Sequence, residues 1–409
     1  IIRNEEGNPY SPRKQGAGLA SMRNVVSTKA YLSVDGSDRP KLELGDDPAR
    51  SGVYTMKFNV ENFSEESVSY KFDFVGMTES VSSSDETFVA ETPYILEGKA
   101  APELVSGEGA SLEGGVITVE PGKKATVRIV YTLTDADKKY IDSKFIYGMY
   151  VEGFVKLLPL ENSDTVQLNV PFLAFYGDWT EAPLFDKTYY EVESEAHNNA
   201  IDDEDKLKAD YYATTPYGSY YYNYIIPLGT YLYTIDTDKY DAIPASRDHI
   251  ALSNILGTID GIGSVYAGLL RNAKTMTFTI TDKVTGEEVY RYVDYDAAKA
   301  HSSGGTPIPY YQFEKIKSQT LGLINNRQYE FKMVGKLDYG DGGEKSNVRN
   351  GFSFDFYMDD EAPIIKDVEY EKIYDKTLKK DRYYLTMTVY DNHYVQSITP
   401  ILFTSSSSY

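Results

Sequence analysis

One acidic segment of the sequence has residue types and spacing suited to binding a metal ion. Asp236, Asp238 and Asp241 lie close together in the stretch Ile235–Asp241. Hard cations such as calcium bind several oxygen atoms at short range, and carboxylates spaced along a loop supply them. The segment lacks the central glycine and the terminal glutamate of an EF-hand loop. Two interpretations stay open, a calcium site formed by these three aspartates or an ordinary acidic turn.

The sequence contains no arrangement typical of a hydrolase active site. A serine or cysteine nucleophile needs a histidine as its base and a third group that orients the histidine. The four histidines, His197, His249, His301 and His393, all lie in turn-like sequence. The acidic run Asp202–Asp205 has no pattern that would fix two carboxylates at the separation that glycosidases use. We therefore assign no catalytic residue to the chain and interpret these positions as solvated surface.

Tyrosines are concentrated in one part of the chain. The stretch Tyr211–Tyr224 holds seven of them in fourteen residues. Tyrosine rings stack well on sugars and peptides, so this stretch is compatible with a binding surface. Tyrosine also populates strands readily, which makes packing within a β-rich fold the simpler interpretation.

The composition excludes several classes of partner. The 409 residues include 62 acidic and 41 basic side chains, a net charge of -21, which repels nucleic acid and anionic membrane surfaces. Without cysteine there is no disulfide scaffold and no thiolate metal site. No apolar run approaches the roughly 20 residues that span a bilayer. The length predicts about two or three domains, and because the first residue is not methionine we expect a piece of a longer protein.

Period-two alternation of apolar and polar residues predicts that β-strands build the chain. Tyr54 to Val60 and Val127 to Leu133 each place apolar side chains on one face of an extended segment. Pro121-Gly122 lies between the second run and Val116–Val119, so we expect a hairpin turn there. About seven such strands before Trp179 predict a sandwich. The same alternation recurs at Met276–Ile280, Tyr329–Met333, Phe352–Phe356 and Tyr383–Val389.

Helical signals are few and short. Gly16 and Gly18 lead into a stretch with Leu19, Met22 and Val26 at helical spacing, which predicts a short helix with an apolar face. Asp135–Tyr140 predicts one helical turn between two strands.

Three stretches resemble the fibronectin-like domain that follows the catalytic domain in cell-envelope subtilisin-like proteinases, the lactocepin group. They read VEPGKKATVRIVYTL from Val119, GMYVEGFVKL from Gly148 and VPFLAFYGDW from Val170. Upstream, Ser11–Thr28 resembles a stretch near the end of the subtilase catalytic domain. Further along, Leu228–Tyr290 is similar to a second fibronectin-like unit. Leu252–Ser264 departs from the polar segment that the family often has there, which puts in doubt any ion site at that place.

The resemblance implies an all-β chain of tandem fibronectin type III-like or immunoglobulin-like sandwiches with a short N-terminal helix. The implied divisions are 1–27, the end of a catalytic domain, 28–179 and 180–362, two sandwiches, and 363–409, a partial third. It implies that the triad lies upstream of Ile1. The chain would then be a non-catalytic part of an extracellular or wall-attached serine endopeptidase from a Gram-positive bacterium.

The implied partners are the protease domain of the same polypeptide and its protein or peptide substrates. A cell-surface adhesin or carbohydrate-binding module that uses the tyrosine-rich stretch is the alternative. The residues encoded before Ile1 would distinguish the two, because a Gly-Thr-Ser segment supports the protease and a signal peptide supports the adhesin.

Overall fold

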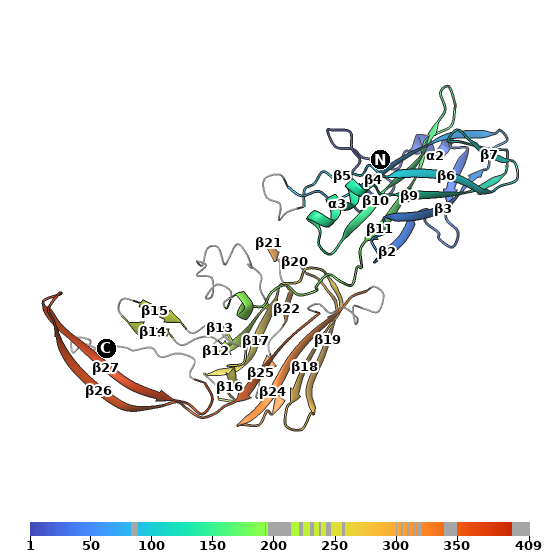
Figure 1. Ribbon diagram of the computed structural model, residues 1–409. Helices are drawn as coiled ribbons and strands as arrows, with labels where there is room; N and C mark the ends of the chain where they lie inside the picture. Colours follow the sequence, from blue (N-terminus) through green and yellow to red (C-terminus); the bar gives the residue numbers. More distant parts are fainter. Residues whose placement is uncertain are drawn as a thin grey trace. The chain divides into compact units, whose positions relative to one another are not determined.

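The chain forms two compact units, Ile1–Ala182 and Pro183–Tyr409, in a computed structural model (Figure 1). The structure describes residues 1–82, 89–192, 194, 214–220, 224–229, 233–236, 239–242, 247–255, 258–299, 301–303, 306–308, 311–313, 316–317, 321–338 and 350–394. Strands predominate in both units, so the predicted all-β fold class is confirmed. The finer boundaries expected at residues 27, 179 and 362 stay a prediction.

The first unit is a two-layered β-sandwich with three short helices. One sheet has the strand order β1-β3-β9-β6, and the other has the order β2-β11-β10-β4-β8-β7 with β5 paired to β4. Neighbouring strands are antiparallel except β2, which runs parallel to β11. The helices are α1 (Pro12–Gln15), α2 (Met22–Ser27) and α3 (Asp135–Lys144). The strands are β1 (Ala30–Ser33), β2 (Leu42–Asp47), β3 (Val53–Asn62), β4 (Val68–Thr78), β5 (Tyr94–Ile95), β6 (Lys99–Ser106), β7 (Ala110–Glu113), β8 (Val116–Val119), β9 (Lys124–Thr132), β10 (Met149–Pro159) and β11 (Leu168–Tyr176).

Alternating side chains from both sheets fill the core between the layers. The apolar residues predicted to share one face of β3 are buried, and each lies opposite a buried residue of β9. Phe74 on β4, in the other sheet, has its ring centroid 4.5 Å from that of Tyr131 on β9. The register pairs are Tyr54–Tyr131, Met56–Ile129, Phe58–Val127 and Val60–Ala125.

The ring of Tyr131 requires glycine at two positions around it. Tyr131 is fully buried, and its hydroxyl has no hydrogen-bond partner among the described residues. A Cβ atom at Gly76 would lie 2.2 Å from that hydroxyl oxygen, and one at Gly98 would lie 2.6 Å from the ring. Desolvation by burial raises the pKa of Tyr131, so the phenol stays neutral.

The turn at Pro121-Gly122 does not form the predicted hairpin. β8 pairs with β4 and β7, whereas β9 pairs with β3 and β6, so the turn carries the chain from one sheet to the other. Period-two alternation identifies a strand but not the strand with which it pairs. Here the backbone N–H of Glu120 donates to the carbonyl of Gly109 over 2.9 Å, which holds the end of β8 beside the loop before β7.

Helix α3 is longer than the single turn predicted from the sequence. Thr134 and Asp137 form a capping box, in which each side chain accepts a hydrogen bond from the other's backbone N–H. The buried carboxylate of Asp137 also accepts from the N–H of Glu97 over 2.9 Å. Because Ile141 in the following turn is buried as well, capping and burial together extend the helix.

The described residues of the second unit form two larger sheets and three two-stranded pairs. The larger sheets have the strand orders β13-β12-β17-β22, with β23 paired to β17, and β16-β25-β24-β18-β19. The pairs are β14-β15, β20-β21 and β26-β27. The strands are β12 (Thr215–Tyr220), β13 (Tyr224–Pro227), β14 (Tyr233–Asp236), β15 (Lys239–Ala242), β16 (Ala251–Leu252), β17 (Ile259–Ala267), β18 (Ala273–Asp282), β19 (Glu288–Ala297), β20 (His301–Ser303), β21 (Thr306–Ile308), β22 (Tyr311–Phe313), β23 (Ile316–Lys317), β24 (Arg327–Lys336), β25 (Gly351–Met358), β26 (Ile364–Asp375) and β27 (Lys380–Tyr390).

The core of the second unit is rich in aromatic rings. Phe278 of β18 stacks on Phe313 of β22 with ring centroids 4.0 Å apart, which brings the two larger sheets together. At the end of β18 the buried carboxylate of Asp282 accepts the N–H groups of Val284 and Thr285 at 2.8 and 3.1 Å. β18 and β19 pair on either side of this turn, so the two strands form a hairpin.

Candidate functional site

An ion-pair cluster joins the N-terminal segment to the first sandwich. We call Arg13, Glu79, Tyr150 and Glu152 the Arg13 clamp. Arg13 lies on α1, where the hydroxyl of Ser11 accepts its backbone N–H over 3.1 Å and caps the helix. Its Nε and Nη2 atoms donate to the two carboxylate oxygens of Glu152 on β10, each over 3.0 Å. Nη2 also donates to Glu79, just beyond the end of β4, which pairs with β10.

The electrostatics of the clamp favour a fixed geometry. The side chain of Glu152 is only 1% exposed, and a buried carboxylate is costly unless it is paired and hydrogen-bonded. Two hydrogen bonds between one guanidinium and one carboxylate strengthen the ion pair and also fix the relative orientation of the two side chains. Burial of Arg13 tends to lower its pKa, but hydrogen bonds and charges from Glu152 and Glu79 outweigh this and raise the pKa. The guanidinium of Arg13 therefore stays charged.

Aromatic rings complete the clamp. The guanidinium of Arg13 lies over the ring of Tyr150 at 4.0 Å, a distance suited to cation–π attraction. Tyr150 packs against Phe175 and Trp179, with ring centroids 5.6 and 5.4 Å away. The backbone N–H of Trp179 donates to Asp46 over 2.8 Å, which fixes the end of this unit at the same place.

Two amide side chains hold the rest of the N-terminal segment. The Oε1 atom of Gln15 accepts the N–H of Ile2 over 2.6 Å, and its Nε2 atom donates to the carbonyl of Tyr10 over 2.6 Å. Asn169 on β11 donates through Nδ2 to the carbonyl of Ala17 over 2.8 Å. The chain is thus bound to neighbouring strands β10 and β11 before it enters α2.

Helix α2 and the residues before it carry the apolar surface that the sequence predicts. None of the residues of α2 is buried. Leu19 is 81% exposed and Met22 is 76% exposed, and Val25 and Val26 are also exposed. We call Leu19, Met22, Val25 and Val26 the α2 patch. A group of large apolar side chains in water is a common sign of an interaction surface.

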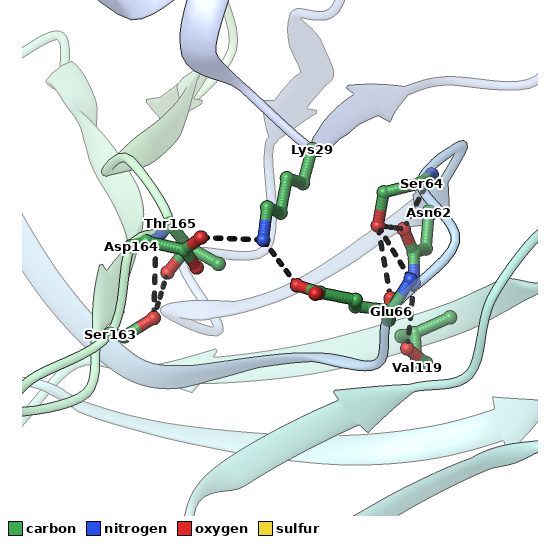
Figure 2. Close-up of polar contacts among 8 residues, drawn as sticks. All are labelled: Lys29, Asn62, Ser64, Glu66, Val119, Ser163, Asp164 and Thr165. Atoms are coloured by element: carbon green, nitrogen blue, oxygen red, sulfur yellow. Dashed lines mark hydrogen bonds and ion pairs between the residues drawn. The ribbon is translucent and has the colours of Figure 1, made fainter.

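Lys29 fixes the point at which the chain leaves α2 and enters β1. Figure 2 shows its Nζ atom between the carboxylates of Glu66 and Asp164, at 2.5 and 2.6 Å. The hydrogen bond from Lys29 is the main cause that lowers the pKa of Asp164. Beside this ion pair, the buried Asn62 donates through Nδ2 to the carbonyls of Glu66 and Val119 at 2.8 and 3.0 Å. The segment is therefore anchored on both sides of α2.

The comparisons with known proteins point to proteinases. Residues 43–173 match the model of an Fn3-like domain. The chain is 25% identical over 405 residues to a PII-type proteinase of Lactococcus lactis subsp. cremoris, an alignment that covers 93% of this chain and 18% of the relative. A PII-type proteinase of Lacticaseibacillus paracasei is 25% identical over 399 residues, with the same coverage. The resemblance to cell-envelope, subtilisin-like proteinases is confirmed.

The chain spans only 18% of the length of these cell-envelope proteinases, which come from Gram-positive bacteria. Among solved structures, the class 5 fimbriae chaperone CfaA aligns with 77% of the chain at 7% identity and a TM-score of 0.23, too low to carry an argument. Within the described residues, no helix is both long and apolar enough to cross a membrane.

The acidic segment considered as a calcium site includes the end of β14 and part of β15, which pair with each other. Asp236 ends β14 opposite Lys239, and Asp241 lies in β15 opposite Thr234. Asp238 lies outside the described residues. In the part of the chain whose side chains are described, no group of three potential ligands could hold a metal ion. The calcium site at Asp236, Asp238 and Asp241 stays a prediction.

The other positions singled out from the sequence are dispersed. The ring of His393 stacks on Tyr357 at 4.2 Å, and that of His249 lies 5.0 Å from Tyr394. His301 begins β20, which corrects the turn expected there, and His197 lies outside the described residues. Within the tyrosine-rich stretch, Tyr217 packs on Tyr266 at 5.0 Å. Most of the other tyrosine side chains of that stretch, and the acidic run 202–205, lie outside the described residues.

The Arg13 clamp does not follow from the sequence patterns described above, although the sequence carries a signal for it. Glu152 is the one acidic residue in a mostly apolar strand, and a charge at such a position needs a buried partner. Gly153 follows it, and a Cβ atom there would lie 1.9 Å from the carbonyl oxygen of Val75. This pair of residues marks a place where β4 and β10 approach closely. The identity of the partner, 139 positions away in the sequence, could not be predicted.

Proposed function

We propose that this chain is a non-catalytic accessory region of an extracellular subtilisin-like serine endopeptidase. It braces the protease domain and contributes to the positioning of protein or peptide substrates. The observation that carries the proposal is the Arg13 clamp, which fixes the segment before the sandwich in a chain that aligns with cell-envelope proteinases over 93% of its length. A flexible tether would need no buried ion pair.

The segment 1–27 is, in this proposal, the last part of the protease domain. The α2 patch supplies an apolar contact for the rest of that domain, and the Arg13 clamp holds the segment against β10. The sandwich provides remote contacts to large substrates, and such contacts contribute to catalysis without supplying a reacting group. We place the parent protein outside the cell, secreted or attached to the wall of a Gram-positive bacterium.

The proposal is tested by comparing the 409-residue chain with its parent. We expect the chain alone to hydrolyse neither casein nor peptides and to resist labelling by a fluorophosphonate. The parent, with its upstream domain present, should show both activities. Specific labelling of the isolated chain would mean that it contains a nucleophile and would contradict the accessory role.

The bracing role is tested in the parent by Arg13→Met. We expect this change to reduce cleavage of casein more than cleavage of a small ester, because only the large substrate uses the sandwich. Arg3→Met is the matched control, since Arg3 is exposed and, among the described residues, its side chain donates only to the nearby carbonyl of Gly7. If Arg13→Met reduced cleavage of casein and of the small ester equally, Arg13 would contribute only to the stability of the protease domain.

A further inference from the structure

The chain passes twice between the larger sheets of the second unit and the β26–β27 hairpin, and both passages are hydrogen-bonded. The first passage, residues 359–363, follows β25, and the second, residues 391–394, follows β27. Segments that link compact parts of a chain are flexible by default, because few contacts cross them. Here the two passages contact the residues before β16, the loops before β17 and β24, and strand β25 itself.

Asn326 contacts both passages through one amide group. Its Nδ2 atom donates to Oε1 of Glu361 over 3.1 Å, and its Oδ1 atom accepts from Nδ2 of Asn392, also over 3.1 Å. Its backbone N–H donates to the carbonyl of Met358, the last residue of β25, over 2.8 Å. The φ angle of Asn326 is 58°, a left-handed conformation that asparagine adopts more readily than most residues. One side chain thus connects the start of β24 to the residues on both sides of the hairpin.

Asp360 holds the first passage at a second place. Its Oδ1 atom accepts from Oγ of Ser253 over 3.0 Å and from the backbone N–H of Asn254 over 2.7 Å. The Nδ2 atom of Asn254 donates to Oδ2 of Asp360 over 3.4 Å and to the carbonyl of Leu323 over 3.1 Å. The backbone N–H of Asp360 donates to Oδ1 of Asn325 over 2.9 Å. Two loops of the sandwich therefore bind the same residue.

Aromatic rings hold the second passage. The ring of His393 stacks on that of Tyr357 on β25, with centroids 4.2 Å apart and planes inclined by 21°. The ring of Tyr394 lies 5.0 Å from that of His249, which precedes β16. Asp391 accepts the backbone N–H of His393 over 3.0 Å, which orders the turn between them. The chain thus returns from β27 to the sheet that it left at the end of β25.

We propose that these contacts form a rigid joint, centred on Asn326, that fixes the direction in which the hairpin leaves the larger sheets. Both passages contribute, because a hairpin held at one strand could still rotate about that strand. Carboxylates grouped in a loop can bind a hard cation. Here amide and hydroxyl groups bind the carboxylates of Asp360 and Glu361, so the joint is independent of metal. In the parent protein it keeps the region beyond β25 at a constant angle to the sheets before it.

Distance measurements between two spin labels on the 409-residue chain test the joint. Lys332→Cys on β24 and Thr386→Cys on β27 place labels at exposed positions outside the joint, and the absence of native cysteine makes the labelling specific. Double electron–electron resonance should give one narrow distribution of distances between the labels. A broad distribution in this chain would overturn the proposal.

Removal of the joint contacts should widen the distribution. Asn326→Gly removes the amide and tolerates the positive φ angle, and Asp360→Ala removes the second contact. With both changes the distribution should lose its single maximum, and a distribution that stays narrow would overturn the joint. Asn162→Gly, at an asparagine of the first unit with a φ angle of 62°, is the matched control and should leave the distances unchanged.

A chelator provides an independent arm that leaves the joint intact. The distribution should be equally narrow with EDTA and with added calcium, because protein donors bind the carboxylates. A distribution that is narrow only with calcium would show a joint held by metal and would overturn the proposal. The labelled chain without joint substitutions and the chelator arm decide the question even if the double variant does not fold.

Discussion

At the scale of single residues, charges buried in the sandwich determine how the N-terminal segment is held. Glu152 has almost no contact with water, and Arg13 is its two-point partner. A buried ion pair contributes little compared with an apolar pair of the same volume, but removing one member leaves the other charge without compensation. The main effect of this ion pair is therefore on geometry, because it fixes one orientation of α1 on β10.

Arg13→Met should lower the free energy of unfolding of the first unit by about 2 to 4 kcal/mol. The usual cost of breaking a buried pair is higher, and we reduce it because 32% of the Arg13 side chain is exposed. Urea denaturation followed by fluorescence of Trp179, the only tryptophan, is a suitable measurement. Arg13→Met combined with Glu152→Gln should lose less stability than Arg13→Met alone, and Arg3→Met should lose almost none. An unstable Arg3→Met would show that the effect does not come from the clamp.

At the scale of secondary-structure elements, close approach between strands decides where glycine is needed. Gly76 on β4 and Gly98 before β6 both face the ring of Tyr131. The two strands belong to opposite sheets, so these contacts set the local thickness of the sandwich. Overpacking at such a site forces side chains or backbone to move.

Gly76→Ala should destabilise the first unit by about 1 to 3 kcal/mol, since its Cβ would lie 2.2 Å from the Tyr131 hydroxyl. Tyr131→Phe removes that oxygen, which has no partner among the described residues, and should by itself change stability little. The double variant should recover part of the loss, which thermal denaturation would measure. If the two changes were simply additive, the proposed clash would be wrong.

At the scale of the whole molecule, the chain consists of two compact units with separate apolar cores. Separate cores allow separate unfolding transitions, so a single melting temperature does not describe the chain. This separation makes it possible to locate a ligand by asking which transition it shifts.

Calcium, if it binds as predicted at Asp236, Asp238 and Asp241, should raise the melting temperature of the second unit only. A ligand that binds the native state stabilises it in proportion to the logarithm of its concentration. Scanning calorimetry with calcium and with a chelator measures the difference, and Asp238→Ala should abolish it. Asp135→Ala, in the first unit, is a matched control. The ordinary acidic turn is the correct interpretation if neither calcium nor chelator moves either transition.

The sequence by itself determined the local structure of this protein. Alternation placed Tyr54 to Val60 and Met276 to Ile280 in strands with the correct buried face, and helical spacing identified the exposed α2 patch. These patterns depend on neighbours a few residues apart, where backbone geometry fixes which side chains share a face.

Only the tertiary structure decided which strands pair and which charges meet. The strands on either side of Pro121-Gly122 separate into different sheets, and Arg13 finds Glu152 across most of the first unit. Both outcomes depend on contacts between residues far apart in the chain. Closing the long loops between such residues costs entropy, and only the assembled core compensates for this cost. The local pattern of a single sequence does not identify such distant partners, so the Arg13 clamp could be recognised only from the positions of β10 and β4 in the structure.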